Sequence, residues 1–239
     1  MIGRFLEISV HAPEILESLA FYESLGFQQV PVGETWAYPY AVVTDGRLTV
    51  GLHQHAIKSP SLTFVKADLI KHAEELRALD LVIEQEHLGS DEFNEISCHD
   101  PNGQHMRILE ARTFSPVDIS PTFSSTCGYF VEYGIPVKEF AESVQFWERF
   151  GLIAMEEDKT LFDRVALTSD HLNLGLHRSR ALRHPVLVFE ADDMHTRLQL
   201  LKHRGFELSD EMPDALDADS NAVIVAPDGT RFLLMQTTN

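Results

Sequence analysis

An internal repeat is the feature that most constrains how this chain of 239 residues can fold. Residues 5–27 and 130–152 align without a gap and at a constant offset. The aligned pairs include Glu7 with Glu132, Ser18 with Ser143, Phe21 with Phe146, Tyr22 with Trp147, and Gly26 with Gly151. Because self-similarity of this kind means that one structural unit occurs more than once, we expect two copies of one domain.

The repeat continues through the rest of both copies. The further matching segments are LTVGLHQ (48–54) with LNLGLHR (172–178), LTFVKADLI (62–70) with LVFEADDMH (187–195), and DPNG (100–103) with APDG (226–229). Residues 112–126 hold two prolines among serines and threonines and show no clear period, which is typical of a linker. The sequence therefore predicts a first domain at 1–111, a linker at 112–126 and a second domain at 127–239.

Each copy divides again into two units with the order strand, helix, short strands. The first helix is marked by Pro13 at its start and by Gly26 after its last turn. In the second unit, Asp68 is expected to cap a helix. This order occurs four times, which predicts an α+β chain and not a regular parallel α/β one.

The charge balance limits the classes of partner. The chain has 37 Asp and Glu against 19 Lys and Arg, a formal net charge of −18, which disfavours nucleic acids and anionic membrane surfaces. No apolar run approaches the roughly 18–20 residues of a membrane span, and the first residues lack the apolar core of a secretory signal. We therefore expect a soluble cytoplasmic protein with a small-molecule partner, and a homodimer is left open.

The repeated segments resemble the vicinal oxygen chelate superfamily, which contains glyoxalase I, bleomycin-resistance proteins and extradiol dioxygenases. The resemblance rests on SLAFYESLGF and SVQFWERFGL, on the two GLH strand ends, and on the PNG and PDG turns. It covers both copies, and the order of the motifs is more specific than any one of them. It implies four βαβββ modules that form two glyoxalase-like, cup-shaped domains of mixed sheet.

In that family, side chains from the first and last strands of paired modules hold a divalent metal, usually through His, Glu or Gln. The residues that match are Glu7 and Glu132 on first strands, and His53 and His177 two residues beyond the last-strand positions at Gly51 and Gly175. Residues two apart on a strand share a face, so His53 and His177 can stand near the missing ligands. Carboxylate and imidazole suit Mn, Fe, Ni or Zn.

Modules two and four depart from the family pattern. Their ligand positions hold Ser61, Arg107, Val186 and Leu233, none of which is a good metal ligand. His105 and His184 lie two residues before the positions of Arg107 and Val186, but that is about 6.6 Å along a strand, against a metal–ligand bond of about 2 Å. If the alignment is wrong by two residues or the strand bulges, these histidines complete two candidate metal sets. The sets are Glu7, His53 and His105 in the first cup, and Glu132, His177 and His184 in the second.

Other roles are open for the same residues. Glu7 and Glu132 can face water as ordinary strand residues. Arg107 can pair with Glu7 where a metal would stand, bind an anionic ligand, or extend to solvent. The remaining ligand-binding candidates are Trp36, Tyr38 and Tyr40, which can line a pocket or only cover the core.

Three functions follow from these expectations. We favour a protein like the bleomycin-resistance branch, which binds a small organic molecule, for instance an anion, in a cup with a degenerate metal site. The alternative is a metal-dependent lyase, isomerase or, less favoured, dioxygenase, in which Glu7 or Glu132 moves a proton. The third is a non-catalytic structural or interaction protein whose cups are filled by side chains.

Overall fold

The computed structural model describes residues 2–32, 36–79, 81–91, 93–111 and 125–237. The linker predicted at 112–126 lies outside the described residues, apart from Ser125 and Thr126. The domain boundaries on either side of it therefore stay predictions.

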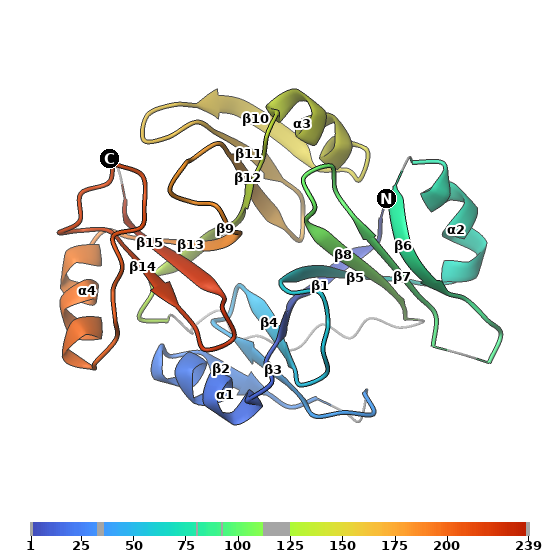
Figure 1. Cartoon of the computed structure of the whole chain (residues 1–239), viewed down its shortest axis with the longest axis horizontal. Helices are drawn as coiled ribbons and strands as arrows, with labels where there is room; N and C mark the ends of the chain where they lie inside the picture. Colours follow the sequence, from blue (N-terminus) through green and yellow to red (C-terminus); the bar gives the residue numbers. More distant parts are fainter. Residues whose placement is uncertain (1, 33–35, 80, 92, 112–124, 238–239) are drawn as a thin grey trace.

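Four modules follow one another along the chain (Figure 1). The first contains β1 (Arg4–His11), α1 (Ile15–Ser24), β2 (Gln28–Val30), β3 (Tyr40–Thr44) and β4 (Thr49–His53). The second contains β5 (Ser61–Lys66), α2 (Leu69–Arg77), β6 (Val82–His87), β7 (Glu95–His99) and β8 (His105–Glu110). The third contains β9 (Tyr129–Pro136), α3 (Phe140–Glu148), β10 (Ile153–Asp158), β11 (Arg164–Thr168) and β12 (Asn173–His177). The fourth contains β13 (Val186–Ala191), α4 (Met194–His203), β14 (Ala222–Val225) and β15 (Arg231–Gln236).

Modules pair in sequence order, and each pair shares one mixed sheet. The first sheet has eight strands in the order β2-β3-β4-β1-β5-β8-β7-β6, and the second has seven in the order β10-β11-β12-β9-β13-β15-β14. The first strands of paired modules run antiparallel at the centre, β1 with β5 and β9 with β13, and each also pairs in parallel with the last strand of its own module. This arrangement confirms the α+β class and the two cups.

Two local features differ from the expectations. In the fourth module, a single bridge between Ser209 and Val223 stands where the other modules have a strand after the helix. The segment there is acidic and contains Pro213, which cannot donate to a strand ladder. Asp68 does precede α2, but its side chain makes no capping hydrogen bond and its φ is 52°; its carboxylate lies 3.4 Å from Lys71 instead. The prediction of a side-chain cap was wrong.

The two halves pack through aromatic and polar contacts. Phe21 and Tyr22 of α1 lie 6.1 and 5.8 Å, between ring centroids, from Phe232 of β15. On the other side, Tyr133 of β9 donates a hydrogen bond of 3.0 Å to Gln104, in the turn before β8. Module one therefore contacts module four, and module two contacts module three. Within the described residues, every helix is too short or too polar to cross a bilayer.

Candidate functional site

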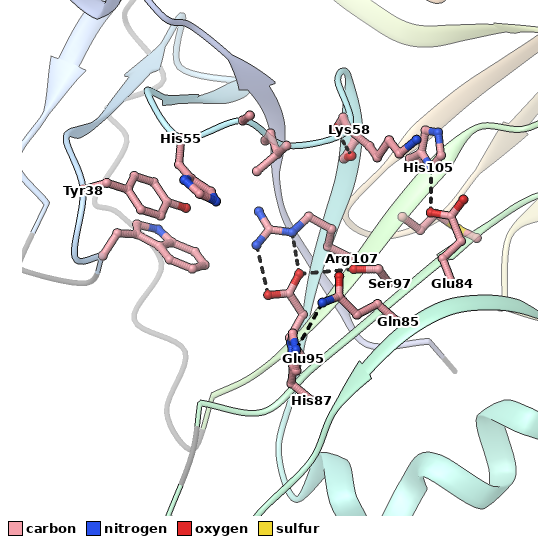
Figure 2. A pocket seen from close by; sticks show the side chains of 15 residues that line it. Tyr38, His55, Lys58, Glu84, Gln85, His87, Glu95, Ser97, His105 and Arg107 are labelled. Carbon is pink, nitrogen blue, oxygen red and sulfur yellow. Dashed lines mark hydrogen bonds and ion pairs between the residues drawn. The ribbon is translucent and has the colours of Figure 1, made fainter.

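A cavity of about 840 Å³ opens on the first sheet (Figure 2). Its wall comes from the segment before β3, from the β4–β5 connection with the first residue of β5, and from β6, β7 and β8. The lining residues are Trp36, Tyr38, His55, Ala56, Ile57, Lys58, Ser61, Glu84, Gln85, His87, Glu95, Ser97, His105, Met106 and Arg107. We call this cavity with its lining the first cup.

Arg107 stands on β8 and reaches into the first cup. Its Nε and Nη2 donate to the two carboxylate oxygens of Glu95, at 2.7 and 3.1 Å, so the pair is bidentate. Glu95 is the diagonal neighbour of Arg107 across the β7–β8 ladder, where Ser97 lies directly opposite. Arg107 therefore pairs with Glu95 and not with Glu7, and because the residue is only 8% exposed, the hypothesis of a reach to solvent is wrong as well.

Glu95 engages only two of the three guanidinium nitrogens of Arg107. Its buried Nη1 has no hydrogen-bond partner among the described residues and points toward Tyr38 and His55 in Figure 2. Burial alone would lower the pKa of Arg107, but the hydrogen bonds and charge of Glu95 raise it above its usual value. The guanidinium therefore stays charged.

Aromatic rings form the wall opposite Glu95. Trp36 stacks on Tyr38 with 5.4 Å between centroids, and Tyr38 stacks on His55 at 5.1 Å. The guanidinium carbon of Arg107 lies 5.3 Å from the Trp36 ring centroid. Tyr40 does not line the cavity; its hydroxyl donates to Glu7 Oε2 at 2.5 Å. Of the predicted ligand-binding residues, Trp36, Tyr38 and Arg107 therefore converge on the cup, and Tyr40 supports it from behind.

Glu7 is buried beneath this wall at 2% exposure, so the alternative of a solvated strand residue does not hold for it. Besides Tyr40, its carboxylate accepts from Ser9 at 2.7 Å and lies 3.0 Å from His53 Nε2. His53 is fully buried, and Tyr38 OH lies 3.1 Å from its Nδ1. Gly51 makes room for this arrangement, because a Cβ there would overlap the Glu7 carboxylate.

The residues present in the first cup do not fit the metal that the fold family implies. Both oxygens of Glu7 are already engaged by Ser9, Tyr40 and His53. His105, the proposed third ligand, lies instead 3.3 Å from Glu84. Within the described ranges, no cluster of three or more His, Cys, Asp or Glu side chains is placed to hold a metal ion.

The second cup keeps Glu132 and His177 but surrounds them differently. Glu132, which is 4% exposed, accepts from Arg164 Nη2 at 2.6 Å, and Gly175 again leaves the space for the carboxylate. Neither ring nitrogen of His177 has a hydrogen-bond partner in the described part of the chain, and burial together with Arg164 lowers its pKa to about 4. His184 is exposed and lines a separate cavity of about 400 Å³ with Tyr133.

Apolar side chains occupy the concave face of the second sheet. The cluster consists of Leu182, Val186, Val188, Met212, Leu216, Val223, Leu233 and Met235, with Leu161, Phe162 and Val131 packed against it. The strand registers place Val188 where the first cup has Thr63, and Leu233 where it has Arg107. The second cup is thus filled by its own side chains over this face.

Sequence reasoning missed Glu95, Ser97 and His55. The residue that matches Glu95 in the other copy is Asn221, so the repeat offered no signal for an acid here. His55 is exposed, and it stacks on Tyr38 at the edge of the cup, which no motif indicated. The alternation of Glu95, Ser97 and His99 along one strand face was the only available clue.

The comparison with solved structures agrees with this fold. No family model matches the sequence, and no curated protein matches it. A catechol 2,3-dioxygenase structure aligns with a TM-score of 0.58 at 18% identity, over 99% of this chain and 87% of its own. Homoprotocatechuate 2,3-dioxygenase from Arthrobacter globiformis aligns with a TM-score of 0.60 at 12% identity, over 98% of this chain and 80% of its own.

A third structure, the Mn(II)-bound glyoxalase from Novosphingobium aromaticivorans, aligns with a TM-score of 0.58 at 12% identity, over 98% of this chain and 82% of its own. At such identities the likeness establishes the fold and not the activity. The match spans both pairs of modules, as the repeat in the sequence requires. The chain therefore has the two-cup fold of the vicinal oxygen chelate superfamily, the group that contains these dioxygenases and the glyoxalase.

Proposed function

We propose that the first cup binds a planar organic anion without a metal, and that the second cup is structural. The observation that carries the proposal is the contrast between the two halves. One concave face holds a cavity of about 840 Å³ lined by stacked rings and a charged arginine, and the other is covered by apolar side chains. A cavity of this size accommodates a drug-sized molecule.

The shape and polarity of the lining support the choice of ligand. Trp36 and Tyr38 lie nearly parallel, with 22° between ring planes, so a flat ring can extend the stack. Arg107 is the charged anchor, because its free Nη1 is the donor that Glu95 leaves unused. His55 and Lys58 add further donors at the rim, where the ligand would enter.

A metal-dependent lyase, isomerase or dioxygenase is supported less well. The dioxygenases and the Mn(II)-bound glyoxalase share the fold. In this chain, however, Arg107 brings a positive charge to the position where the family has a ligand, and both carboxylate oxygens of Glu7 already have hydrogen-bond partners. A cation placed beside a guanidinium would be repelled. We therefore derive no step through a metal.

The experiment is a titration of the full chain with a fused-ring aromatic carboxylate and, separately, with its neutral carboxamide. Quenching of Trp36 fluorescence monitors binding. We expect the carboxylate to bind about tenfold more tightly than the amide, since a charged hydrogen bond to Arg107 adds about 1.5 kcal/mol or more. Trp36→Phe removes the signal of this site and leaves that of Trp147, which is buried in α3.

The charge of Glu95 needs its own control. Arg107→Gln alone leaves Glu95 unpaired in the cup, where it would repel an anion. The double variant Arg107→Gln/Glu95→Gln removes both charges, and we expect it to bind acid and amide equally. Arg178→Gln breaks an exposed pair with Asp163 elsewhere and should change nothing. Equal affinity for acid and amide in the wild type would refute the anion site.

The wider setting is also part of this proposal. We propose that the protein acts in the cytoplasm, as one domain at 1–111 and another at 127–239, on a small molecule and not on nucleic acid. The net charge of −18 supports the last point, because a phosphate backbone would be repelled. Sedimentation of the full chain decides whether it forms the homodimer that the sequence leaves open.

A further inference from the structure

Trp36, which belongs to the aromatic wall of the first cup, is not fixed by backbone pairing. It lies four residues before β3 and belongs to no strand. Its indole stacks on Tyr38 at 5.4 Å, and the guanidinium carbon of Arg107 lies 5.3 Å from its ring centroid. The orientation of the indole in the free protein therefore depends on the side chains around it.

Phe93 contacts Trp36 from the second module. The two ring centroids lie 5.4 Å apart with 68° between the planes, which is an edge-to-face pair. Phe93 lies two residues before β7, is 50% exposed and belongs to neither hydrophobic cluster of the described residues. It is also absent from the cavity lining, so it does not meet a ligand directly. Its ring therefore serves neither the core nor the ligand itself, and what it does contact is Trp36.

The backbone at Phe93 is held in place by its neighbour Asn94. This asparagine is buried, its Oδ1 accepts from Gly89 N at 2.7 Å, and its Nδ2 donates to Glu110. Its carbonyl oxygen accepts from Glu110 N at 2.9 Å. None of these hydrogen bonds involves the Phe93 side chain. The ring is therefore presented to Trp36 from a fixed position, and it can be removed without loosening this turn.

The second half has neither ring of this contact. The strand registers give the equivalent positions, first half and then second, as Tyr40 with Arg164, Tyr38 with Phe162, Trp36 with Thr160, and Phe93 with Asp219. The two rings of the contact are thus present together in the first cup and absent together from the second, which apolar side chains cover. This links Phe93 to the ligand wall and not to the fold, which the second half completes without it.

We propose that Phe93 is a positioning residue of the first cup, which holds the Trp36 indole in the orientation that stacks on a planar ligand. This inference rests on the proposed function and deepens it. A ring that is held in place before binding loses less freedom when the ligand arrives, so the affinity is higher. Because the contact carries no charge, Phe93 strengthens the binding of a planar acid and of its neutral amide by the same factor. Arg107, in contrast, distinguishes the acid from the amide.

The first test needs no ligand. Near-UV circular dichroism of the full chain reports on how rigidly each indole is held. We expect Phe93→Ala to lose signal with the shape of the Trp36 contribution, which is the wild-type spectrum minus that of Trp36→Phe, while the urea unfolding midpoint stays unchanged. Phe93→Tyr keeps the ring and should match the wild type. Leu16→Ala removes an exposed apolar side chain of α1 and is the matched control. If the spectrum of Phe93→Ala matches that of the wild type, the positioning role is refuted.

The second test is calorimetric titration with the fused-ring aromatic carboxylate and with its carboxamide. We expect Phe93→Ala to bind both about twofold to tenfold more weakly, as the loss of one aromatic pair predicts, with the ratio of the two affinities unchanged. The double variant Arg107→Gln/Glu95→Gln should instead change the ratio. If both ligands bind the wild type and Phe93→Ala weakens the acid alone, or neither, the positioning role is refuted and the anion site stands. If neither ligand binds the wild type, the proposed function fails and this role fails with it.

Discussion

Gly51→Ala is the substitution that tests the buried Glu7 arrangement most directly. Gly51 has an ordinary negative-φ strand conformation, so alanine meets no backbone strain, and a change of this kind elsewhere stabilises by about 0.4–1 kcal/mol. Here the added methyl group would overlap the carboxyl carbon and both oxygens of Glu7. The carboxylate must move, because β4 pairs with β1 on one side and β3 on the other and therefore cannot shift.

The cost follows from the partners that Glu7 would lose. Its carboxylate holds three hydrogen bonds, to Ser9, Tyr40 and His53, and each charged bond of this kind contributes about 1.5–3 kcal/mol. If displacement breaks two of the three, Gly51→Ala lowers the free energy of unfolding by about 3–6 kcal/mol. Gly175→Ala displaces Glu132, whose carboxylate accepts a single side-chain hydrogen bond, from Arg164, among the described residues, so about 1.5–3 kcal/mol is expected there.

Urea unfolding of the full chain, followed by far-UV circular dichroism and by tryptophan fluorescence, measures both variants. Trp36 reports on the first half and Trp147 on the second. The decisive control is Gly51→Ala in a Glu7→Ala background, where no carboxylate remains to be displaced. We expect a coupling of at least about 3 kcal/mol between the two changes. If Gly51→Ala costs the same with and without Glu7, the reasoning is wrong.

Two further predictions concern acid and metal. His177 has a pKa lowered to about 4, so it stays neutral in the folded protein, whereas the same residue in the unfolded chain takes up a proton below about pH 6.5. The free energy of unfolding therefore falls as the pH drops from 6.5 to 4, by about 3 kcal/mol in full. Urea unfolding at pH 7 and pH 4.5 should show a flatter pH dependence for His177→Gln, and an unchanged slope would contradict this. For metal, elemental analysis of untagged protein should show no bound metal. The melting temperature should not change with a chelator or with added Mn, Fe, Ni or Zn. About one metal per chain, lost in Glu7→Ala, would overturn the conclusion that the residues of the first cup do not fit a metal.

The fold could be predicted from the sequence because the repeat carries non-local information. One copy alone shows only helix and strand periods, whose assembly is ambiguous. Two copies with the same order fix which segments are equivalent, and the GLH strand ends and PDG-type turns connect them to a known architecture. The missing strand of module four shows the limit, because the acidic segment around Pro213 shares no pattern with the other modules.

The site could be predicted only in part. Arg107, Trp36 and Tyr38 were identified because they break the repeat, and all three line the first cup. Their partners depend on cross-strand register, which the sequence does not state. Glu95 reaches Arg107 diagonally across β7 and β8, and a shift of one residue would have turned it to the other face. The same uncertainty made His105 look like a ligand beside Glu7.

The differences between the copies locate function better than their similarities do. Both halves keep a buried glutamate on the first strand and a glycine facing it, and both make the carboxylate part of the sheet interior. A feature kept in the second cup, which apolar side chains cover, as well as in the first cup serves the fold. What distinguishes the open cup is the set of groups around that glutamate, where Tyr40 and Tyr38 stand in place of Arg164 and Phe162. Exchanging Tyr38 for phenylalanine therefore converts one contact of the first cup into that of the second, which makes the second cup the internal reference for what the first cup does.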